Sequence, residues 1–294
     1  MIAHHFTIDV EEYFQVAAFE SYIARSAWER FRSRVAAQME LLLGLLARHN
    51  ARATCFVVGW VGERQRDLVR AIARAGHEVA SHGWDHARVT NLTPAQFRDS
   101  VRRSKHLLED VTGAPVVGFR APNFSIVRGR EWALDVLIEE GYRYDSSLFP
   151  VRRPGYGYPG GHPDPHWIER PAGRLAEIPP ATLHCGPLRL PAAGGAYFRL
   201  LPYGVIRGAL RQCERREVPG TFYIHPWELD PAQPRVEVSW LTRVRHYGGL
   251  GRTLPRLERL LTEFRFEPIR ETVVALARAR VRCQVPMLLS ERST

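Results

Sequence analysis

His82 and His86 are the residues of this sequence whose type and spacing most directly suggest chemistry. They follow residues 76–80, a short apolar run that is typical of a buried strand. Three residues separate the two histidines, which would place both imidazoles on the same side of a helical turn, within reach of one ion. Neutral imidazole is a good ligand for zinc and similar metals. The chain has 12 histidines, so this spacing alone fits a helix cap with two solvated histidines equally well.

Polar side chains also follow four other predicted strands. With the two histidines, the set of residues at strand ends is Asp9 and Glu11, His82 and His86, Arg120, Asp145, and His225. A carboxylate beside a buried strand, such as Asp9, costs folding free energy unless a charged group meets it. Taken singly, each residue has a structural interpretation: Arg120 and Asp145 would form an internal ion pair, and His225 would be a turn residue satisfied by the backbone. Taken together, they would meet where parallel strands end.

The elements that must position these residues alternate along the chain. Strands are predicted at residues 6–10, 53–59, 76–80, 116–119, 142–144, 221–224 and 267–269. Helices are predicted at residues 35–49, 61–75, 94–110, 130–140, 201–214 and 251–264. The helix after Thr93 has a proline in its first turn and Gln96 at the capping-box position. Residues 17–30 are amphipathic and aromatic, and we expect a helix there that covers the mouth of the fold.

The alternation stops between residues 150 and 200, where proline and glycine are frequent. We expect an ordered excursion with short strands at 167–169 and 175–178, because loops of this length in a compact domain are usually functional. Its tyrosines and Trp167 would either line a groove for a sugar or pack the proline-rich loop. Residues 279–294 are interpreted as a basic tail.

Composition and charge restrict the class of protein. The chain has 294 residues, a hydrophobic fraction of 45% and a formal net charge of +10. This charge favours an anionic polymer or a membrane surface as partner, but aromatic residues do not alternate with basic ones as in a nucleic-acid stacking platform. No nucleic acid is therefore expected. The four scattered cysteines indicate reduced thiols, and no leader or membrane-spanning run is recognisable, so we expect a cytoplasmic location.

In this order, the strand ends resemble the motifs of the polysaccharide deacetylase family, also called carbohydrate esterase family 4 or the NodB homology domain. The matching segments are residues 7–11, 82–86, 120–122, 145–150 and 224–225. Residues 9–16, 194–199 and 225–228 are also similar to the subgroup associated with exosortase-linked exopolysaccharide loci. The resemblance implies an α/β fold, a deformed (β/α) barrel that forms a single domain over residues 1–278. This domain would include the excursion at 150–200 and a C-terminal extension specific to the subgroup.

The resemblance also implies an activity, the removal of N-acetyl groups from acetamido sugars. Glu11, His82 and His86 would hold a divalent ion, with zinc expected and cobalt or nickel as alternatives. Asp9 would be the general base, positioned by Arg120. His225 would be the general acid, and Asp145 would fix its tautomer. The backbone N–H of Asn123 would bind the oxyanion.

One position departs from the family pattern. Val10 stands where the family usually has the second of two adjacent aspartates, the metal ligand. Glu11 is the next carboxylate and is therefore the predicted third ligand. Glu12 is the alternative ligand, and an exchange of roles between Asp9 and Glu11 also remains open.

The expected partner is an N-acetylated polysaccharide or a lipid-linked oligosaccharide, with the protein peripheral to the inner face of a membrane. A second hypothesis is a small-molecule amidohydrolase that opens cyclic ureides on the same scaffold. A third is a sugar-binding protein without activity. It is disfavoured because all five motifs retain side chains able to perform the chemistry.

Overall fold

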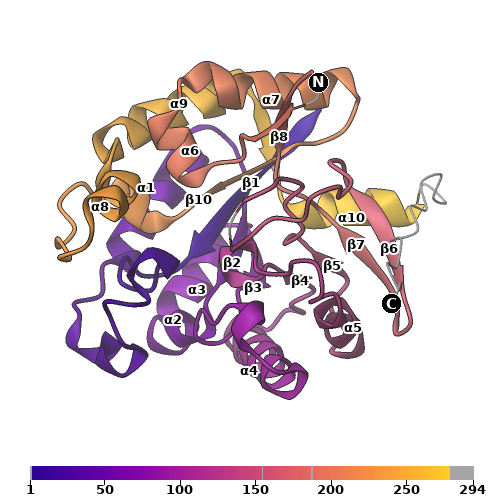
Figure 1. The fold of residues 1–294 in the computed structure, drawn as a ribbon, viewed down its shortest axis with the longest axis horizontal. Helices are drawn as coiled ribbons and strands as arrows, with labels where there is room; N and C mark the ends of the chain where they lie inside the picture. The colour runs from indigo at the N-terminus through magenta and orange to yellow at the C-terminus, as the bar shows by residue number, and fades with distance from the viewer. Residues whose placement is uncertain (1, 154, 187, 279–294) are drawn as a thin grey trace, which may run out of the picture.

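The computed structural model describes residues 2–153, 155–186 and 188–278, and it places the first apolar run at the centre of a parallel sheet (Figure 1). This run is strand β1 (Ala3–Val10), which is buried along most of its length. Because both of its edges are paired and both of its faces are covered, it reads as a continuous apolar run rather than an alternating one. The predicted basic tail at 279–294 lies outside the described residues.

The parallel sheet explains why distant strand ends come together. The strands that follow β1 in the sheet are β2 (Thr54–Val57), β3 (Glu78–Ser81), β4 (Gly118–Phe119), β5 (Tyr144–Asp145), β7 (Gly173–Glu177) and β6 (His166–Arg170). On its other side β1 pairs with β10 (Thr221–Ile224), and residues 3–5 of β1 pair with β11 (Arg265–Glu267) on the edge that β2 occupies further along the strand. All these pairs are parallel except β6 with β7. The polar residues after β1, β3, β4, β5 and β10 therefore share one end of the sheet.

The two edges of the sheet are linked by extended segments rather than by a full ladder. Pro180, just after β7, forms an isolated parallel bridge with Thr221 of β10, and the Ala181 N–H donates to the Thr221 carbonyl. Gly194 forms a second such bridge with Tyr223. These contacts close the sheet into a barrel that is irregular on one side. The predicted deformed (β/α) barrel is confirmed.

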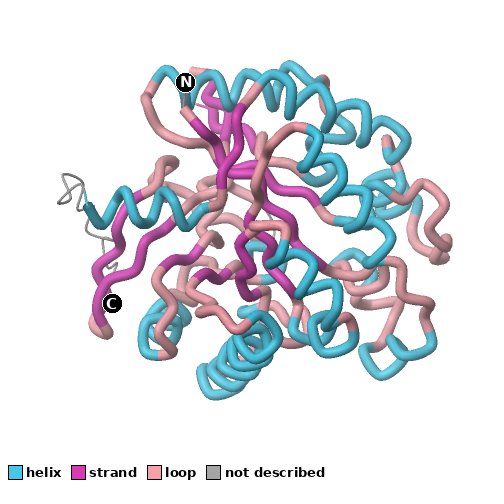
Figure 2. Tube along the Cα trace, turned by 180° about the vertical axis from the view of Figure 1, so that it is seen from behind, coloured by secondary structure: helices cyan, strands magenta, loops and turns pink. Residues whose placement is uncertain are grey.

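Helices cover the outside of the sheet, as the view from behind shows (Figure 2). They are α1 (Val35–Arg48), α2 (Gly59–Arg64), α3 (Arg66–Arg74), α4 (Pro94–Thr112), α5 (Trp132–Glu139), α6 (Gly195–Leu200), α7 (Tyr203–Arg215), α8 (Trp240–Tyr247), α9 (Thr253–Glu263) and α10 (Ile269–Arg278). The capping box predicted at Thr93 and Gln96 is present, and α4 ends at Gly113 in the left-handed conformation, with φ of 68°.

Several predicted elements differ from the structure. The helix predicted at 61–75 is two helices, because Gln65 (φ −120°, ψ 47°) leaves the helical conformation between them. Residues 17–30 form two short 3-10 segments, Ala17–Phe19 and Arg25–Arg30, instead of a helix. Their aromatic side chains Phe19 and Trp28 are buried in a separate apolar cluster, so packing rather than helical period decides their positions. Helices α6, α8 and α10 were not predicted.

In the described part of the excursion, the two predicted strands form the β6–β7 hairpin. A second hairpin, β8 (Thr182–Cys185) with β9 (Leu188–Pro191), was not predicted. Trp167 is 8% exposed and packs in an apolar cluster with Tyr144, so it is a packing residue and does not line a groove.

Candidate active site

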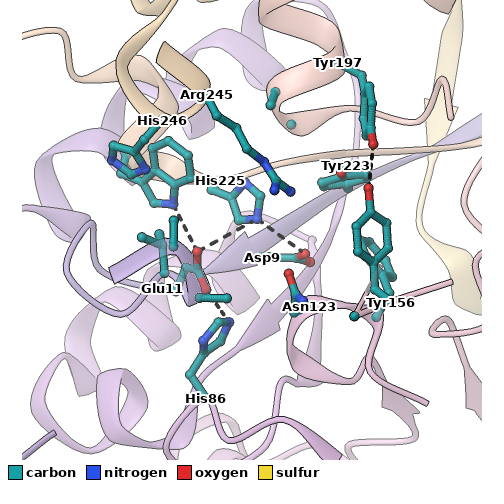
Figure 3. Close-up of a pocket in the computed structure, with 18 of the residues that line it drawn as sticks. Asp9, Glu11, His86, Asn123, Tyr156, Tyr197, Tyr223, His225, Arg245 and His246 are labelled. Atoms are coloured by element: carbon teal, nitrogen blue, oxygen red, sulfur yellow. Dashed lines mark hydrogen bonds and ion pairs between the residues drawn. The ribbon is translucent and has the colours of Figure 1, made fainter. Parts of the chain in front are cut away.

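A cavity at the carboxyl end of the sheet gathers most of the predicted site residues (Figure 3). Its volume is about 270 Å³. The predicted residues that line it are Asp9, Glu11, His82, His86, Asn123 and His225. Arg120 and Asp145 are fully buried behind the wall and do not line the cavity.

Glu11, His82 and His86 form the cluster in this cavity that could hold a metal ion. One ligand atom from each residue lies within 4.8 Å of the others, and all three side chains are buried. Glu11 Oε2 lies 2.6 Å from His86 Nε2, yet this oxygen makes no hydrogen bond among the described residues. A buried carboxylate oxygen without a donor, next to two imidazoles, suits a shared divalent ion. The donor set therefore fits the predicted metal.

The loop after β3 brings the two histidines together by a route that differs from the prediction. Residues 82–88 are not helical, and His86 has a φ of 55° in the left-handed region. Gly83, with a φ of 73°, allows the sharp turn between them. A positive φ is costly for histidine, and such strain is frequent at functional sites. The predicted helical turn is wrong, although the two rings are 5.2 Å apart as required.

The hydrogen bond of His82 defines which nitrogen is free. Its Nδ1 lies 2.7 Å from the backbone carbonyl oxygen of Arg120. A carbonyl oxygen can only accept, so Nδ1 carries the proton and Nε2 keeps its electron pair for an ion. The histidine is thus oriented by the strand end of β4.

One carboxylate oxygen of Glu11 accepts a hydrogen bond, and the other, Oε2, accepts none among the described residues. Trp227 Nε1 donates to Glu11 Oε1 at 3.0 Å. Burial raises the pKa of this carboxyl, but the charges of His86 and His225 outweigh burial and lower the pKa to about 2. Glu11 is therefore ionised and directed at the two histidines.

Glu12 does not reach the cavity. Its carboxylate accepts hydrogen bonds from the Ser33 hydroxyl and from the Arg34 N–H, at 3.0 Å to Oε2. This places it at the start of α1, where it contributes to the N-terminal end of the helix. The alternative prediction of Glu12 as a metal ligand is wrong, because its oxygens are already used there.

Asp9 is held by Arg120, as predicted. Arg120 Nη1 donates to Asp9 Oδ1 and to Thr7 Oγ1, both at 2.7 Å, and its Nη2 donates to Ser146 Oγ at 2.9 Å. The guanidinium has no exposed surface, and its carbon lies 4.2 Å from the centre of the Phe56 ring. A fully buried, paired arginine fixes the carboxylate in position.

His225 stands across the cavity from the histidine pair. Its Nε2 lies 3.8 Å from Glu11 Oε1 and 3.9 Å from Asp9 Oδ2. Its Nδ1 lies 2.7 Å from Glu228 Oε1. Burial lowers the pKa of His225, but the surrounding carboxylates outweigh it and raise the pKa to about 9. A protonated imidazole in this place can donate a proton from Nε2.

Glu228 and Arg199 were missed by the sequence-based prediction of the site. Arg199 Nε donates to Glu228 Oε2 at 2.6 Å, and both side chains are fully buried. Burial raises the pKa of Glu228, but Arg199 and His225 outweigh burial and lower it. The His-Pro-Trp-Glu spacing carried a usable signal, because residues at N-cap and N3 of a short helical turn contact each other. Arg199 lies 29 residues away and gave no such signal.

Asp145 does not contact His225, so the predicted tautomer-fixing role is wrong and Glu228 occupies that position. Ser147 donates to Asp145 through its hydroxyl at 2.6 Å and through its N–H at 3.1 Å. In the adjacent strand Glu177 lies opposite Asp145 in the register. Burial raises the pKa of Asp145 to about 6 and that of Glu177 well above its ordinary value. The short β5 strand ends too deep in the barrel to reach the cavity.

Aromatic and basic side chains form the opposite wall of the cavity. Tyr156, Tyr197, Tyr223, Arg245 and His246 line it (Figure 3). The hydroxyls of Tyr156 and Tyr197 are 2.5 Å apart. Tyr156 comes from the proline-rich excursion, so this part of the excursion does line the cavity. Such a wall can contact the face and hydroxyls of a sugar ring.

Comparison with known proteins divides the chain into two segments. Residues 35–143 match the polysaccharide deacetylase family. Residues 146–274 match a domain of unknown function, DUF3473. A peptidoglycan deacetylase of Helicobacter pylori is 33% identical over 109 residues, which cover 36% of each chain.

Residues 35–143 therefore carry a polysaccharide deacetylase domain. The peptidoglycan-N-acetylglucosamine deacetylase of Bacillus cereus is another relative, 24% identical over 144 residues, or 41% of this chain and 51% of the relative. The matches thus cover about a third to a half of the curated relatives. Asp9 and Glu11 precede the segment that matches the deacetylase family, and His225, Glu228 and Arg199 lie in the segment of unknown function.

Solved structures with the same fold cover nearly the whole chain. One is a protein of Mycobacterium smegmatis assigned to the polysaccharide deacetylases, with a TM-score of 0.68, 19% identity and coverage of 99% of this chain and 94% of that one. Another is an allantoinase, with a TM-score of 0.60, 16% identity and coverage of 95% and 91%. At these identities the likeness shows the fold alone.

Proposed function

We propose that this protein is a metal-dependent hydrolase that removes N-acetyl groups from acetamido sugars of a polysaccharide or its precursor, in the synthesis of an exopolysaccharide. The observation that carries the proposal is the placement of Glu11, His82 and His86 in one cavity with Asp9 and His225. This set combines a site for an ion, a base held by an arginine, and an acid held by a glutamate. Metal-assisted amide hydrolysis uses these three functions.

Glu11, His82 and His86 would hold the ion, and we take zinc as the first choice, with cobalt or nickel as alternatives. When bound, the ion would polarise the acetyl carbonyl and lower the pKa of a water molecule. The site residues supply the remaining steps.

Asp9 accepts a proton from the water as the water oxygen bonds to the acetyl carbon, and Arg120 holds this carboxylate in its orientation. The carbon–nitrogen bond then breaks. His225 donates a proton from Nε2 to the leaving amine, so that acetate and a free amino sugar are formed. Glu228, fixed by Arg199, accepts from Nδ1 and keeps His225 in the donating orientation. Asn123 lines the cavity, and its backbone N–H is the proposed donor to the carbonyl oxygen.

Acetate release tests this proposal. Purified protein is treated with a chelator, reloaded with zinc, cobalt or nickel, and assayed with N-acetylglucosamine oligomers and with allantoin. We expect acetate from the oligomers only after metal is restored. Opening of allantoin without acetate release would favour the ureide hypothesis, and no reaction of either substrate with any of the three metals would favour the sugar-binding protein. The His82→Ala variant is the control for contaminating hydrolases.

A further inference from the structure

Helix α8 exposes an unusual set of large apolar side chains. Trp240 is 75% exposed, Leu241 is 69% exposed and Val244 is 40% exposed. At 100° per residue these three lie within one arc of the helix, and the buried His246 lies on the opposite side. Exposed tryptophan and leucine on one helix face usually mark an interaction site.

The exposed face continues onto a second segment of the cavity rim. Tyr22 is 48% exposed, and its hydroxyl accepts a hydrogen bond from the Ser239 N–H, one residue before α8, at 3.4 Å. We call Tyr22, Trp240, Leu241 and Val244 the α8 patch. Ala17 and Ala18, shortly before Tyr22, line the cavity, as do Arg245 and His246 of α8. Figure 1 shows α8 at the same side of the barrel as the carboxyl end of β1, so the patch belongs to the rim of the cavity.

Positive charge surrounds the α8 patch. Arg235, Arg243 and Arg245 are exposed and have no ion-pair partner within the described ranges 2–153, 155–186 and 188–278. Glu237 is the exposed acidic residue of the same stretch. The carboxylates on the other side of the rim are neutralised by arginines, in the pairs Glu20 with Arg88, Asp85 with Arg25, and Glu29 with Arg64. The rim around the patch is therefore net positive.

We propose that the α8 patch docks this protein on the surface of an anionic phospholipid bilayer. A helix that presents tryptophan and leucine between basic residues is typical of binding in the interface plane of a membrane. Arginine side chains would pair with lipid phosphates while the apolar side chains enter the headgroup region. In the described part of the chain no helix is both long and apolar enough to cross a membrane, so the proposed attachment is peripheral.

Charge favours a bilayer over a second copy of this chain. A twofold contact through the patch would bring the same three arginines of each copy against one another, which opposes association. Four side chains are also few for a stable dimer, which needs about 800 Å² from each partner. An anionic bilayer would attract these arginines, and docking on it does not require a large protein–protein contact. Docking would hold the cavity rim at the membrane, and it does not depend on the activity proposed above.

Vesicle sedimentation tests the docking. Wild-type protein, with its metal, is mixed with vesicles of phosphatidylglycerol and phosphatidylethanolamine, and separately with vesicles of phosphatidylcholine alone. We expect binding to the anionic vesicles that is at least about tenfold stronger and is weakened by salt. The variant with Trp240→Ala and Leu241→Ala should lose at least about tenfold of this binding. The matched control is Leu188→Ala with Leu190→Ala, which removes an exposed apolar pair of the β8–β9 hairpin and should bind as wild type.

A charge variant and the oligomeric state complete the test. Arg243→Glu should reduce binding to anionic vesicles and leave acetate release from a soluble oligomer unchanged, so docking and activity are measured separately. Equal binding of the wild type and the double variant would overturn the proposal. Absence of vesicle binding would overturn it too, and a dimer in light scattering that the double variant dissociates would assign the patch to a second copy.

Discussion

Two groups of buried carboxylates lie on the same sheet and behave differently. Asp9 and Glu11, at the end of β1, face the cavity and meet an arginine and two histidines. Asp145 and Glu177, on β5 and β7, face each other behind the cavity and meet serine and backbone N–H groups. All four side chains are almost completely buried. The two groups therefore differ in the residues that contact them and not in their burial.

The difference decides which carboxylates can perform chemistry. The neighbouring histidines His86 and His225 outweigh burial at Glu11 and lower its pKa to about 2. No cation contacts the rear pair as directly, so burial raises the pKa of Asp145 to about 6 and that of Glu177 further. Glu177 Oε2, which has no other partner among the described residues, can then donate a proton to Asp145. The rear pair therefore lacks a cationic partner within the described part of the chain, whereas the cavity pair contacts basic side chains and lines the cavity.

The rear pair still supports the site indirectly. Ser147, whose hydroxyl donates to Asp145, accepts a hydrogen bond from the Ala121 N–H at 2.7 Å. Ala121 follows Arg120, the residue that holds Asp9. Asp145 is therefore a positioning residue for the loop of Arg120. The following substitutions separate the two groups, from the largest expected effect to the smallest.

His82→Ala should remove the bound metal and reduce acetate release by at least about a hundredfold. Loss of a residue that hydrogen-bonds to a metal ligand costs about ten- to a hundredfold, and loss of the ligand itself should cost more. Metal content by mass spectrometry and acetate release are the measurements. His106→Ala, an exposed histidine of α4, should change neither quantity. A His82→Ala protein that retains one ion per chain would refute the ligand role.

Asp9→Asn should retain metal and lose turnover by about a hundredfold to ten-thousandfold, the range for a general base. The amide can still accept from Arg120 but cannot take a proton. Metal content and kcat are measured together. Loss of metal in this variant would make Asp9 a ligand and would leave Glu11 as the candidate base.

Glu228→Gln should lower kcat by about ten- to a hundredfold without loss of metal, because His225 loses its charged partner. The informative comparison is Asp145→Asn, which tests the partner expected from the sequence. We expect Asp145→Asn to change kcat by less than about threefold, since the residue does not contact His225. A larger loss of kcat in Asp145→Asn than in Glu228→Gln would support Asp145 as the residue that fixes the tautomer of His225, and it would contradict the geometry.

Glu177→Gln should have the smallest effect, and it should appear in stability rather than activity. A carboxyl whose folded pKa is raised contributes stability that is present below its unfolded pKa and is lost as pH rises through the folded pKa. The wild type should therefore lose stability from about pH 4.5 upwards, while glutamine, which can donate to Asp145 permanently, should not. We expect the variant to gain on the order of 1 kcal/mol relative to wild type between pH 5 and pH 8. Urea unfolding at the two pH values measures this, and equal pH dependence of both proteins would mean that Glu177 is ionised.

The fold was predictable because its signals are local. Alternating strands and helices, the cap at Thr93 and the polar strand ends indicate parallel β/α units with the chemistry at the carboxyl ends of the strands, and the family resemblance implied that these units form a barrel. The positions of Glu11, His82 and His86 followed from the same pattern. Residues 17–30 could not be predicted correctly, because burial of Phe19 and Trp28 in a tertiary cluster overrides helical propensity.

The partner of His225 was not predictable from the strand order. Asp145 ends a parallel strand as the other site residues do, but β5 has only two residues and its end stays buried. The left-handed turn at His86 also leaves no trace in the sequence. Arg199 acts across 29 residues through a contact that only the folded chain creates. Tertiary contacts of this kind are not encoded by local spacing.

The most direct test of the central claim is a crystal structure of the zinc-loaded protein with the ion located by anomalous scattering. We expect one peak bound by Glu11, His82 and His86, with ligand distances of about 2.0–2.2 Å, and with Asp9 held by Arg120 outside the ligand set. An ion bound by Asp9 in place of Glu11, or located away from the two histidines, would contradict the account.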